Sequence, residues 1–175
     1  MTGQLSKINE ANPDAIIVFG ASPGPEIINK NARQLGIKAP LYIFRPDSVK
    51  KYIELAGPAA EGATLITDKL SVFEAIPNGD YQYKQRRAYL AAYKDAYGNY
   101  PSSAGGYVYD SFLIITEALK ATGGAAGEKV RDYVEHITDF AGIIGTYTMS
   151  PKDHNGVFSV YETAVVKGGT VVLVK

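Results

Sequence analysis

The sequence contains no cysteine, and this absence excludes disulfide bonds, thiolate metal ligands and catalysis by a thiol. Tryptophan is also absent, whereas 13 residues are tyrosine. The net charge is zero, because 18 basic side chains balance 18 acidic ones, so no field of one sign would attract nucleic acid or an acidic membrane surface. No stretch approaches the roughly 20 consecutive apolar residues that span a bilayer. The remaining composition, 46% hydrophobic, is typical of a globular protein with a core.

The first 14 residues are mostly polar, and the first apolar run begins at Ala15. A signal peptide needs an apolar segment near the N-terminus, so we expect none in the chain as written, which would then stay in the cytoplasm. The length of 175 residues fits one domain or two small lobes.

Residues 15–36 predict the first half of a βαβ unit. Residues 15–19 form an apolar run rich in β-branched side chains, which predicts a strand buried on both faces. Glycine and proline make residues 20–25 a loop, and from Glu26 the apolar residues follow a helical period up to Gly36. Ligands of open α/β sheets bind beyond the carboxyl ends of strands, so residues 20–26 are expected to line any site.

The rest of the chain continues this alternation and then changes character. Strands are predicted at 41–44 and 63–67, and helices at 3–11, 49–55, 81–97, 107–122 and 128–137. Asp47 or Ser48 is expected to cap the helix at 49–55. After Phe140 the period falls to two, which predicts strands at 142–149 and 158–166 and a final hairpin that turns at Gly168-Gly169. The pattern indicates an α/β fold with a parallel sheet.

Six short phrases are distributed along nearly the whole chain. They are Asn12-Pro13-Asp14-Ala15-Ile16-Ile17, Pro25-Glu26, Ala32-Arg33-Gln34-Leu35-Gly36, Ala60-Glu61-Gly62, Tyr107-Val108-Tyr109-Asp110 and Ser150-Pro151-Lys152-Asp153-His154-Asn155-Gly156. Together, in this order and spacing, they resemble the type I periplasmic solute-binding proteins, specifically the Leu/Ile/Val-binding-protein-like receptors of ABC importers. The last phrase resembles the subset of these extracellular receptors that is tied to uptake of aromatic or other hydrophobic carboxylates.

The resemblance covers only the C-terminal half of such a receptor. It implies a truncated, three-layer α/β lobe in which residues 1–101 belong to the second lobe, 102–149 to an incomplete first lobe, and 150–175 return to the second. It also implies a periplasmic or extracytoplasmic substrate-binding component that closes two lobes around a branched-chain amino acid or a hydrophobic or aromatic carboxylate. Its partners would be that small molecule and the importer's membrane permease, without a cofactor, a metal or nucleic acid.

The missing half would hold the signal peptide and the first-lobe loop that binds the ligand carboxylate. We therefore expect a truncated gene product or an engineered fragment. The helices of residues 107–137 would lack the sheet that they cover in a whole receptor, and a bare apolar face of that size would not stay in water. Either they fold over a sheet edge of the same chain or two chains exchange them, and we favour a homodimer by helix exchange.

The candidate ligand-binding residues follow from the resemblance. Ala21, Ser22 and Pro23 match a ligand-lining loop, although the same residues would also make a simple turn. Arg45 follows the second strand, near the place where amino-acid-binding members present an acid to the ligand's ammonium group. An arginine there would repel an ammonium group and bind a carboxylate or stack on a ring; the alternative is an ordinary solvated arginine.

Tyrosines supply the remaining candidates. Tyr107 and Tyr109 flank the second crossing between the lobes, where they either pack a hinge or contact an apolar ligand. Phe73 and Tyr81, in an irregular segment, are weaker candidates of the same kind.

Signals for an enzyme are few. His136 and His154 have scattered acidic neighbours that form neither a metal set nor a catalytic triad, and residues 153–156 are better explained as a turn closed by side-chain-to-backbone bonds. Residues 20–24 lack the lysine of a P-loop and the spacing of a dinucleotide fingerprint. Two alternatives to a solute receptor stay open: a flavodoxin-like domain that binds a nucleotide or flavin, and a ligand-free remnant or interaction module.

Overall fold

The computed structural model describes residues 1–46, 48–124, 127–158 and 160–174. Contacts between Cα atoms divide the chain into unit 1, residues 1–76 with 161–175, and unit 2, residues 77–160. These limits do not coincide with the predicted boundaries at 101 and 149. The helix at 83–97 belongs to unit 2 because Gln82 and Arg86 hydrogen-bond to the backbone of Gly145 and Ile143.

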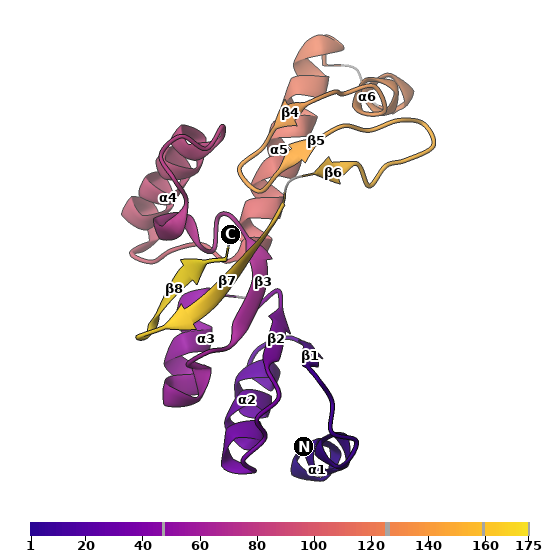
Figure 1. The fold of residues 1–175 in the computed structure, drawn as a ribbon. Helices are drawn as coiled ribbons and strands as arrows, with labels where there is room; N and C mark the ends of the chain where they lie inside the picture. The colour runs from indigo at the N-terminus through magenta and orange to yellow at the C-terminus, as the bar shows by residue number, and fades with distance from the viewer. Residues whose placement is uncertain (47, 125–126, 159, 175) are drawn as a thin grey trace. The chain divides into compact units, whose positions relative to one another are not determined.

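Unit 1 is an α/β unit around a five-stranded mixed sheet (Figure 1). The strand order is β1-β2-β3-β7-β8, in which β1, β2 and β3 are parallel and β7 and β8 are antiparallel to their neighbours. The strands are β1 (Ile16–Phe19), β2 (Leu41–Phe44), β3 (Thr64–Asp68), β7 (Tyr161–Lys167) and β8 (Thr170–Leu173), and the helices are α1 (Thr2–Glu10), α2 (Gly24–Gln34) and α3 (Val49–Ala56), with short 3-10 turns η1 (Gly57–Ala60) and η2 (Phe73–Ala75).

The local signals explain where these elements begin and end. Helix α2 starts at Gly24, two residues before the predicted change of period, because Pro25 is compatible with the first turn of a helix. Ser48 caps α3 through its Oγ, which accepts a hydrogen bond from the Lys51 N–H at 3.3 Å, whereas the alternative cap, Asp47, lies outside the described residues. The predicted hairpin is confirmed, with Lys167 paired to Thr170 across Gly168-Gly169.

The sheet of unit 1 buries one face. Its core side chains are Ile16, Val18, Leu41, Ile43, Leu65, Ala164 and Val166, and Ala32, Tyr52 and Ala56 of the helices α2 and α3 are buried with them. On the opposite face Ile17 is 65% exposed and Phe19 is 70% exposed. The prediction that strand 15–19 is buried on both faces is therefore wrong: an apolar run shows that a strand is able to be buried, not that other residues cover both its faces.

In its described residues, unit 2 contains three helices and a small antiparallel sheet of order β4-β5-β6. The helices are α4 (Tyr83–Tyr97), α5 (Ser103–Ala121) and α6 (Glu128–Val134), and the strands are β4 (Phe140–Ala141), β5 (Thr146–Tyr147) and β6 (Val157–Phe158). Ile114, Ile137 and Tyr147 form a small buried cluster between α5, the end of the α6 segment and the sheet. The predicted strand at 142–149 is largely wrong, because residues 142–145 form a turn between β4 and β5. The predicted strand at 158–166 is divided between β6 and β7, with Ser159 outside the described residues.

Buried polar side chains hold that turn from two helices. Asp110 of α5 is fully buried, and its carboxylate accepts hydrogen bonds from the N–H groups of Ile143 and Ile144 and from the Tyr147 hydroxyl, at 2.7, 2.9 and 2.8 Å. Arg86 of α4, also fully buried, donates through Nε to the Ile143 carbonyl at 2.7 Å and pairs with Asp80. Burial raises the pKa of Asp110, and the three hydrogen bonds and the Arg86 charge oppose that rise.

Candidate functional site

The carboxyl edge of the unit 1 sheet brings together four of the predicted site residues. Strands β1 and β2 are parallel and pair Phe19 with Phe44, so the segment after β1 and the segment after β2 leave the sheet at the same edge. Ala21, Ser22 and Pro23 lie in the first segment and Arg45 in the second. Helices α2 and α3 both begin at this edge, so their N-terminal N–H groups point to the same side of the sheet.

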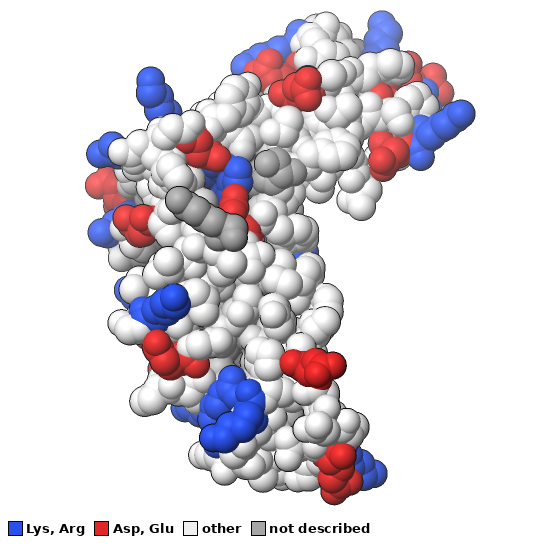
Figure 2. All heavy atoms as spheres, in the orientation of Figure 1, with Lys and Arg blue, Asp and Glu red and all other residues white. Residues whose placement is uncertain are grey.

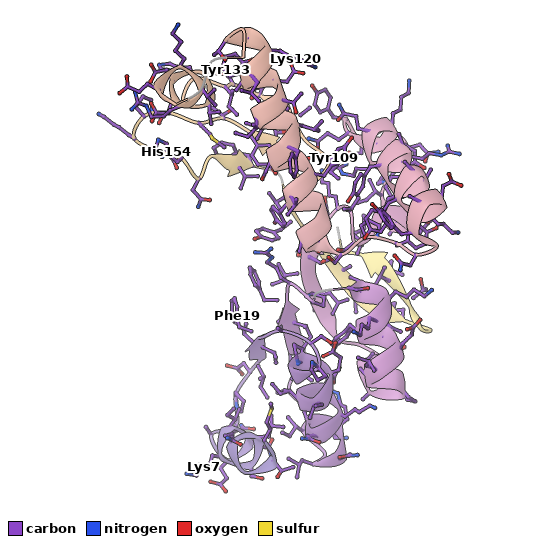
Figure 3. All side chains as sticks on the ribbon, turned by 180° about the vertical axis from the view of Figure 1, so that it is seen from behind. Lys7, Phe19, Tyr109, Lys120, Tyr133 and His154 are labelled. Carbon is purple, nitrogen blue, oxygen red and sulfur yellow. The ribbon has the colours of Figure 1, made fainter. Side chains whose placement is uncertain are left out.

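Three aromatic rings form a row at this edge, which we call the aromatic row: Phe19, Phe44 and Tyr161. The Phe19 and Phe44 ring centroids are 4.5 Å apart, and those of Phe44 and Tyr161 are 5.5 Å apart. Tyr161 pairs with Asp68, the last residue of β3, so all three rings lie at strand ends. Phe19 projects from the end of β1 in Figure 3, and Tyr161 is exposed as well. The aromatic row is a surface of mutually tilted rings, exposed at Phe19 and Tyr161.

Sequence reasoning missed the aromatic row. A signal was available, since Phe19 and Phe44 are the last residues of the two predicted parallel strands, where ligands of such sheets bind. The sequence did not indicate that Tyr161 belongs to this row. Tyr161 lies beside β3 because β7, almost 100 positions later in the chain, pairs with β3.

Arg45 has an unusual backbone conformation. Its φ is 49°, in the left-handed region that residues other than glycine seldom adopt. Its N–H donates to the Ile66 carbonyl of β3 at 2.8 Å, which fixes the backbone where β2 ends. Strained residues of this kind gather at ligand-binding sites, where the surrounding structure maintains them. The residue is exposed at the edge that carries the aromatic row.

Ser22 connects the segment after β1 to helix α2. Its Oγ donates to Glu26 Oε1 at 2.9 Å, and Glu26 is buried in the first turn of α2, where a helix N-terminus favours negative charge. Within the described residues, Glu26 Oε2 and the nearby buried Asn29 Oδ1 on α2 have no hydrogen-bond partner. Asn29 Nδ2 donates to the Tyr52 hydroxyl at 2.5 Å. Ser22 therefore positions the loop through a buried carboxylate.

The two predicted tyrosines lie in unit 2, on helix α5. The Tyr109 ring lies 4.6 Å from that of Tyr89 on α4, and Figure 3 shows it on the side of α5 that faces α4. Tyr109 lines an open groove of about 970 Å³ between the two helices, which we call the tyrosine groove. Its lining residues are Gln85, Ala88, Tyr89, Ala92, Tyr93, Tyr97, Ala104, Gly105, Val108, Tyr109, Phe112, Leu113 and Ile143. Tyr107 is half-buried on α5 and does not line this groove.

The weaker candidates, Phe73 and Tyr81, belong to different units. Phe73 lies in η2 of unit 1 and is half-buried, whereas Tyr81 precedes α4 in unit 2 and is exposed. Neither lines the tyrosine groove.

The histidines make structural contacts. His136 Nδ1 lies 2.6 Å from the Asp132 carbonyl oxygen, and His154 Nε2 lies 2.9 Å from Glu135 Oε1. The predicted turn at 153–156 is confirmed, because the Asn155 N–H donates to Asp153 Oδ1 at 2.9 Å. Among the described residues, no group of three or more acidic or histidine side chains is placed to hold a metal ion.

Charges and helix lengths add two general findings. Basic and acidic side chains are interspersed on the face of the molecule in Figure 2, without a patch of one sign. Within the described residues, every helix is too short or too polar to cross a membrane.

Comparison of this sequence with models of known protein families shows to which family the chain belongs. The family model described as periplasmic binding protein matches residues 1–170. The chain belongs to the periplasmic binding protein family. The predicted family and the α/β fold are thereby confirmed. Comparison with curated protein sequences gives no match.

Solved structures extend this result. An extracellular ligand-binding receptor from Rhodopseudomonas palustris HaA2 is 27% identical, with a TM-score of 0.88 over 99% of this periplasmic binding protein and 51% of the receptor. The leucine-binding protein LivK from Thermotoga maritima MSB8 is 24% identical, with a TM-score of 0.78 over 99% of this chain and 47% of LivK. A solute-binding protein of an ABC transporter from R. palustris, solved in complex with benzoate, is 21% identical. Its TM-score is 0.74, and the match covers 98% of this chain and 45% of that protein. This periplasmic binding protein thus spans about half the length of these relatives.

Proposed function

We propose that this chain is part of the substrate-binding component of an ABC importer and that it contacts a hydrophobic or aromatic carboxylate at the carboxyl edge of the unit 1 sheet. The observation that carries the proposal is the aromatic row beside Arg45. Rings offer an apolar planar surface, and a guanidinium group at the same edge favours a carboxylate and repels an ammonium group. Within the ligand classes predicted from the sequence, this arrangement favours aromatic carboxylates over branched-chain amino acids.

Two relatives represent the two ligand classes predicted from the sequence. One is a leucine-binding protein, and another was solved in complex with benzoate. We infer that the whole receptor acts in the periplasm, closes two lobes around its ligand and delivers it to a membrane permease. Family membership also argues against catalysis, because the relatives are binding proteins.

A titration of the chain with a panel of small molecules tests the proposal. Saturation-transfer NMR with benzoate, 4-hydroxybenzoate, cyclohexanecarboxylate, leucine and valine should give signals that are strongest for the aromatic acids. We expect millimolar affinity, about −4 kcal/mol, because one wall of a two-lobed site supplies only part of the binding free energy. A micromolar dissociation constant would show that this half-site is stronger than proposed. Stable binding of flavin or a nucleotide would favour the flavodoxin-like alternative, and no signal from any compound would favour the ligand-free module.

The predicted homodimer is a separate proposal for the isolated chain. Light scattering should give twice the mass of the 18.8 kDa chain if two copies exchange helices when nothing else covers α5.

A further inference from the structure

The sequence contains two Asn-Gly pairs, Asn78-Gly79 and Asn155-Gly156, and both lie in unit 2. An asparagine side chain that precedes glycine is open to attack by the backbone nitrogen of that glycine, because glycine has no Cβ to obstruct the approach and adopts more backbone conformations than other residues. The nitrogen and the side-chain carbonyl carbon must approach to about 3–3.5 Å, so the local structure decides which pair reacts.

We propose that Asn78 is a site of spontaneous deamidation and that the fold protects Asn155. The Gly79 nitrogen bonds to the Asn78 side-chain carbon Cγ, and the bond from Cγ to Nδ2 breaks. The amide leaves as ammonia and carries the proton that the Gly79 nitrogen gives up. Water then opens the five-membered succinimide at either carbonyl, its hydroxyl joining the carbon and its proton the nitrogen, which gives aspartate or isoaspartate. This inference is independent of solute binding by unit 1.

The surroundings of Asn78-Gly79 permit the reaction. Both residues are exposed and lie in a turn between Pro77 and Asp80. The Asp80 N–H donates to the Pro77 carbonyl at 3.0 Å, which joins the ends of the turn, and within the described residues no hydrogen bond restrains the Gly79 N–H. A Cβ added at Gly79 would meet no atom within 4 Å, so the space beside this residue is empty. The backbone at Gly79 is therefore able to rotate toward the Asn78 side chain.

The surroundings of Asn155-Gly156 oppose the same reaction. The Asn155 N–H donates to Asp153 Oδ1 at 2.9 Å, and the Asn155 carbonyl accepts from the Val157 N–H at 2.8 Å. Gly156 is buried, and its carbonyl accepts from the Thr148 N–H at 2.7 Å. A Cβ added at Gly156 would clash with the Thr148 carbonyl oxygen. These contacts fix the backbone on both sides of the reacting nitrogen and keep it from the geometry of attack.

Deamidation of Asn78 would alter the chain where unit 1 continues into unit 2, since the first segment of unit 1 ends at Ile76. Either product adds one negative charge to a chain whose net charge is zero. Isoaspartate also lengthens the backbone by one CH₂ group. The new carboxylate would lie two positions before Asp80, which pairs with the buried Arg86. Aged protein is therefore expected to separate from fresh protein by charge.

Ageing of the full chain tests the proposal. The folded protein would be incubated at physiological temperature, at neutral and at mildly alkaline pH, and peptides from a protease digest would be analysed by mass spectrometry. We expect aspartate and isoaspartate to accumulate at position 78 about tenfold faster than at 155 or more, because only the first pair reaches the geometry of attack. Alkaline pH should accelerate the reaction, since the attacking nitrogen must lose its proton. In denaturant the two pairs should react at similar rates.

Variants connect the acidic product to this pair. Gly79→Ala should slow deamidation of Asn78 about tenfold or more, since a Cβ obstructs the approach of the nitrogen. Gly3→Ala is the matched control, because a Cβ there also meets no atom within 4 Å, and it should leave the rate unchanged. Asn78→Gln should abolish the acidic form seen by ion exchange, and circular dichroism checks that the variants fold.

Three results would each overturn the proposal. The first is an intact Asn78 in the folded chain under conditions where the denatured chain reacts. The second is an equal rate at Asn78 and Asn155 in the folded chain, and the third is an unchanged rate in Gly79→Ala.

Discussion

The Asp110 carboxylate accepts a hydrogen bond from the Ile143 N–H at 2.7 Å and thereby joins helix α5 to the turn between β4 and β5. The same turn is held from α4, because Arg86 donates to the Ile143 carbonyl. Both polar groups of one backbone residue are thus bound by buried side chains from two helices. The arrangement gives unit 2 a polar centre in addition to its small apolar cluster.

Asp110→Asn should destabilise the protein by about 1–3 kcal/mol, because one amide N–H₂ would face a donor that now has a carboxylate oxygen as its acceptor. Urea unfolding followed by circular dichroism measures the change. Asp132→Asn, at an exposed residue paired with Arg131, is the matched control and should change stability by less than about 1 kcal/mol. Equal effects of the two substitutions would show that the Asp110 contacts contribute little.

Gly142→Ala should destabilise unit 2 by about 1–3 kcal/mol through overpacking. An added Cβ would lie 2.7 Å from Asp110 Oδ1, and three hydrogen bonds prevent that carboxylate from moving away. The control is Gly3→Ala, where a Cβ meets no atom within 4 Å, so the change should be neutral or slightly stabilising. Thermal unfolding of the two variants makes the comparison, and an unchanged melting temperature for Gly142→Ala would contradict the predicted clash.

Stability should fall at alkaline pH because of Tyr52. Burial raises the pKa of Tyr52 from 10.0 to about 12, while the hydrogen bond from Asn29 opposes the rise. The folded state therefore disfavours the phenolate, so this contribution to stability is complete below pH 10 and is lost as the pH rises through about 12. The loss should reach about 1.4 kcal/mol by about pH 11.

The variant Tyr52→Phe isolates that contribution, since the other tyrosines titrate alike in both proteins. The wild type should lose about 1.4 kcal/mol of unfolding free energy relative to Tyr52→Phe between about pH 9 and about pH 11. A difference between the two proteins that stays constant over this range would contradict the raised pKa.

The proposed carboxylate site predicts distinct effects of two substitutions. Arg45→Gln should remove most of the benzoate signal, because the guanidinium group supplies the charge that faces the carboxylate. Phe19→Leu should keep binding but reduce the preference for benzoate over cyclohexanecarboxylate by about 0.5–1.5 kcal/mol, the contribution of one aromatic pair.

Controls for these variants come from unit 2. Arg87→Gln and Phe158→Leu make the same chemical changes at exposed positions of unit 2, outside the predicted site residues, and should bind as the wild type does. Saturation-transfer NMR measures all four variants. Undiminished benzoate binding by Arg45→Gln would exclude Arg45 as the carboxylate partner.

Sequence patterns predicted where helices and hairpins lie better than they predicted which side chains are buried. The change of period near Glu26 located α2, and Gly168-Gly169 located the final hairpin, because both signals are local. The exposure of Ile17 and Phe19 was not predictable in the same way, since it depends on which residues cover the outer face of the sheet.

The buried charges of unit 2 were missed for a related reason. Arg86 and Asp110 lie on helices where a charged residue normally indicates a solvated face. Their partners are backbone groups of Ile143 and Ile144, more than 30 positions along the chain, and only the tertiary fold brings them together. At the candidate site, the loop at 21–23 and Arg45 were predicted by resemblance, whereas the position of Tyr161 depends on the returning strand β7.

The place of β7 in the sheet has a consequence for biosynthesis. Strand β3 receives its second neighbour from residues 161–167, after the whole of residues 77–160 has been made. The residues of unit 2 therefore leave the ribosome before β3 has its second neighbour, and an unpaired strand edge of this kind is able to pair wrongly with other nascent chains. Residues 161–167 supply the strand that pairs with β3, so a stop near residue 160 would release a product that holds the residues of unit 2 and an unfinished unit 1 sheet.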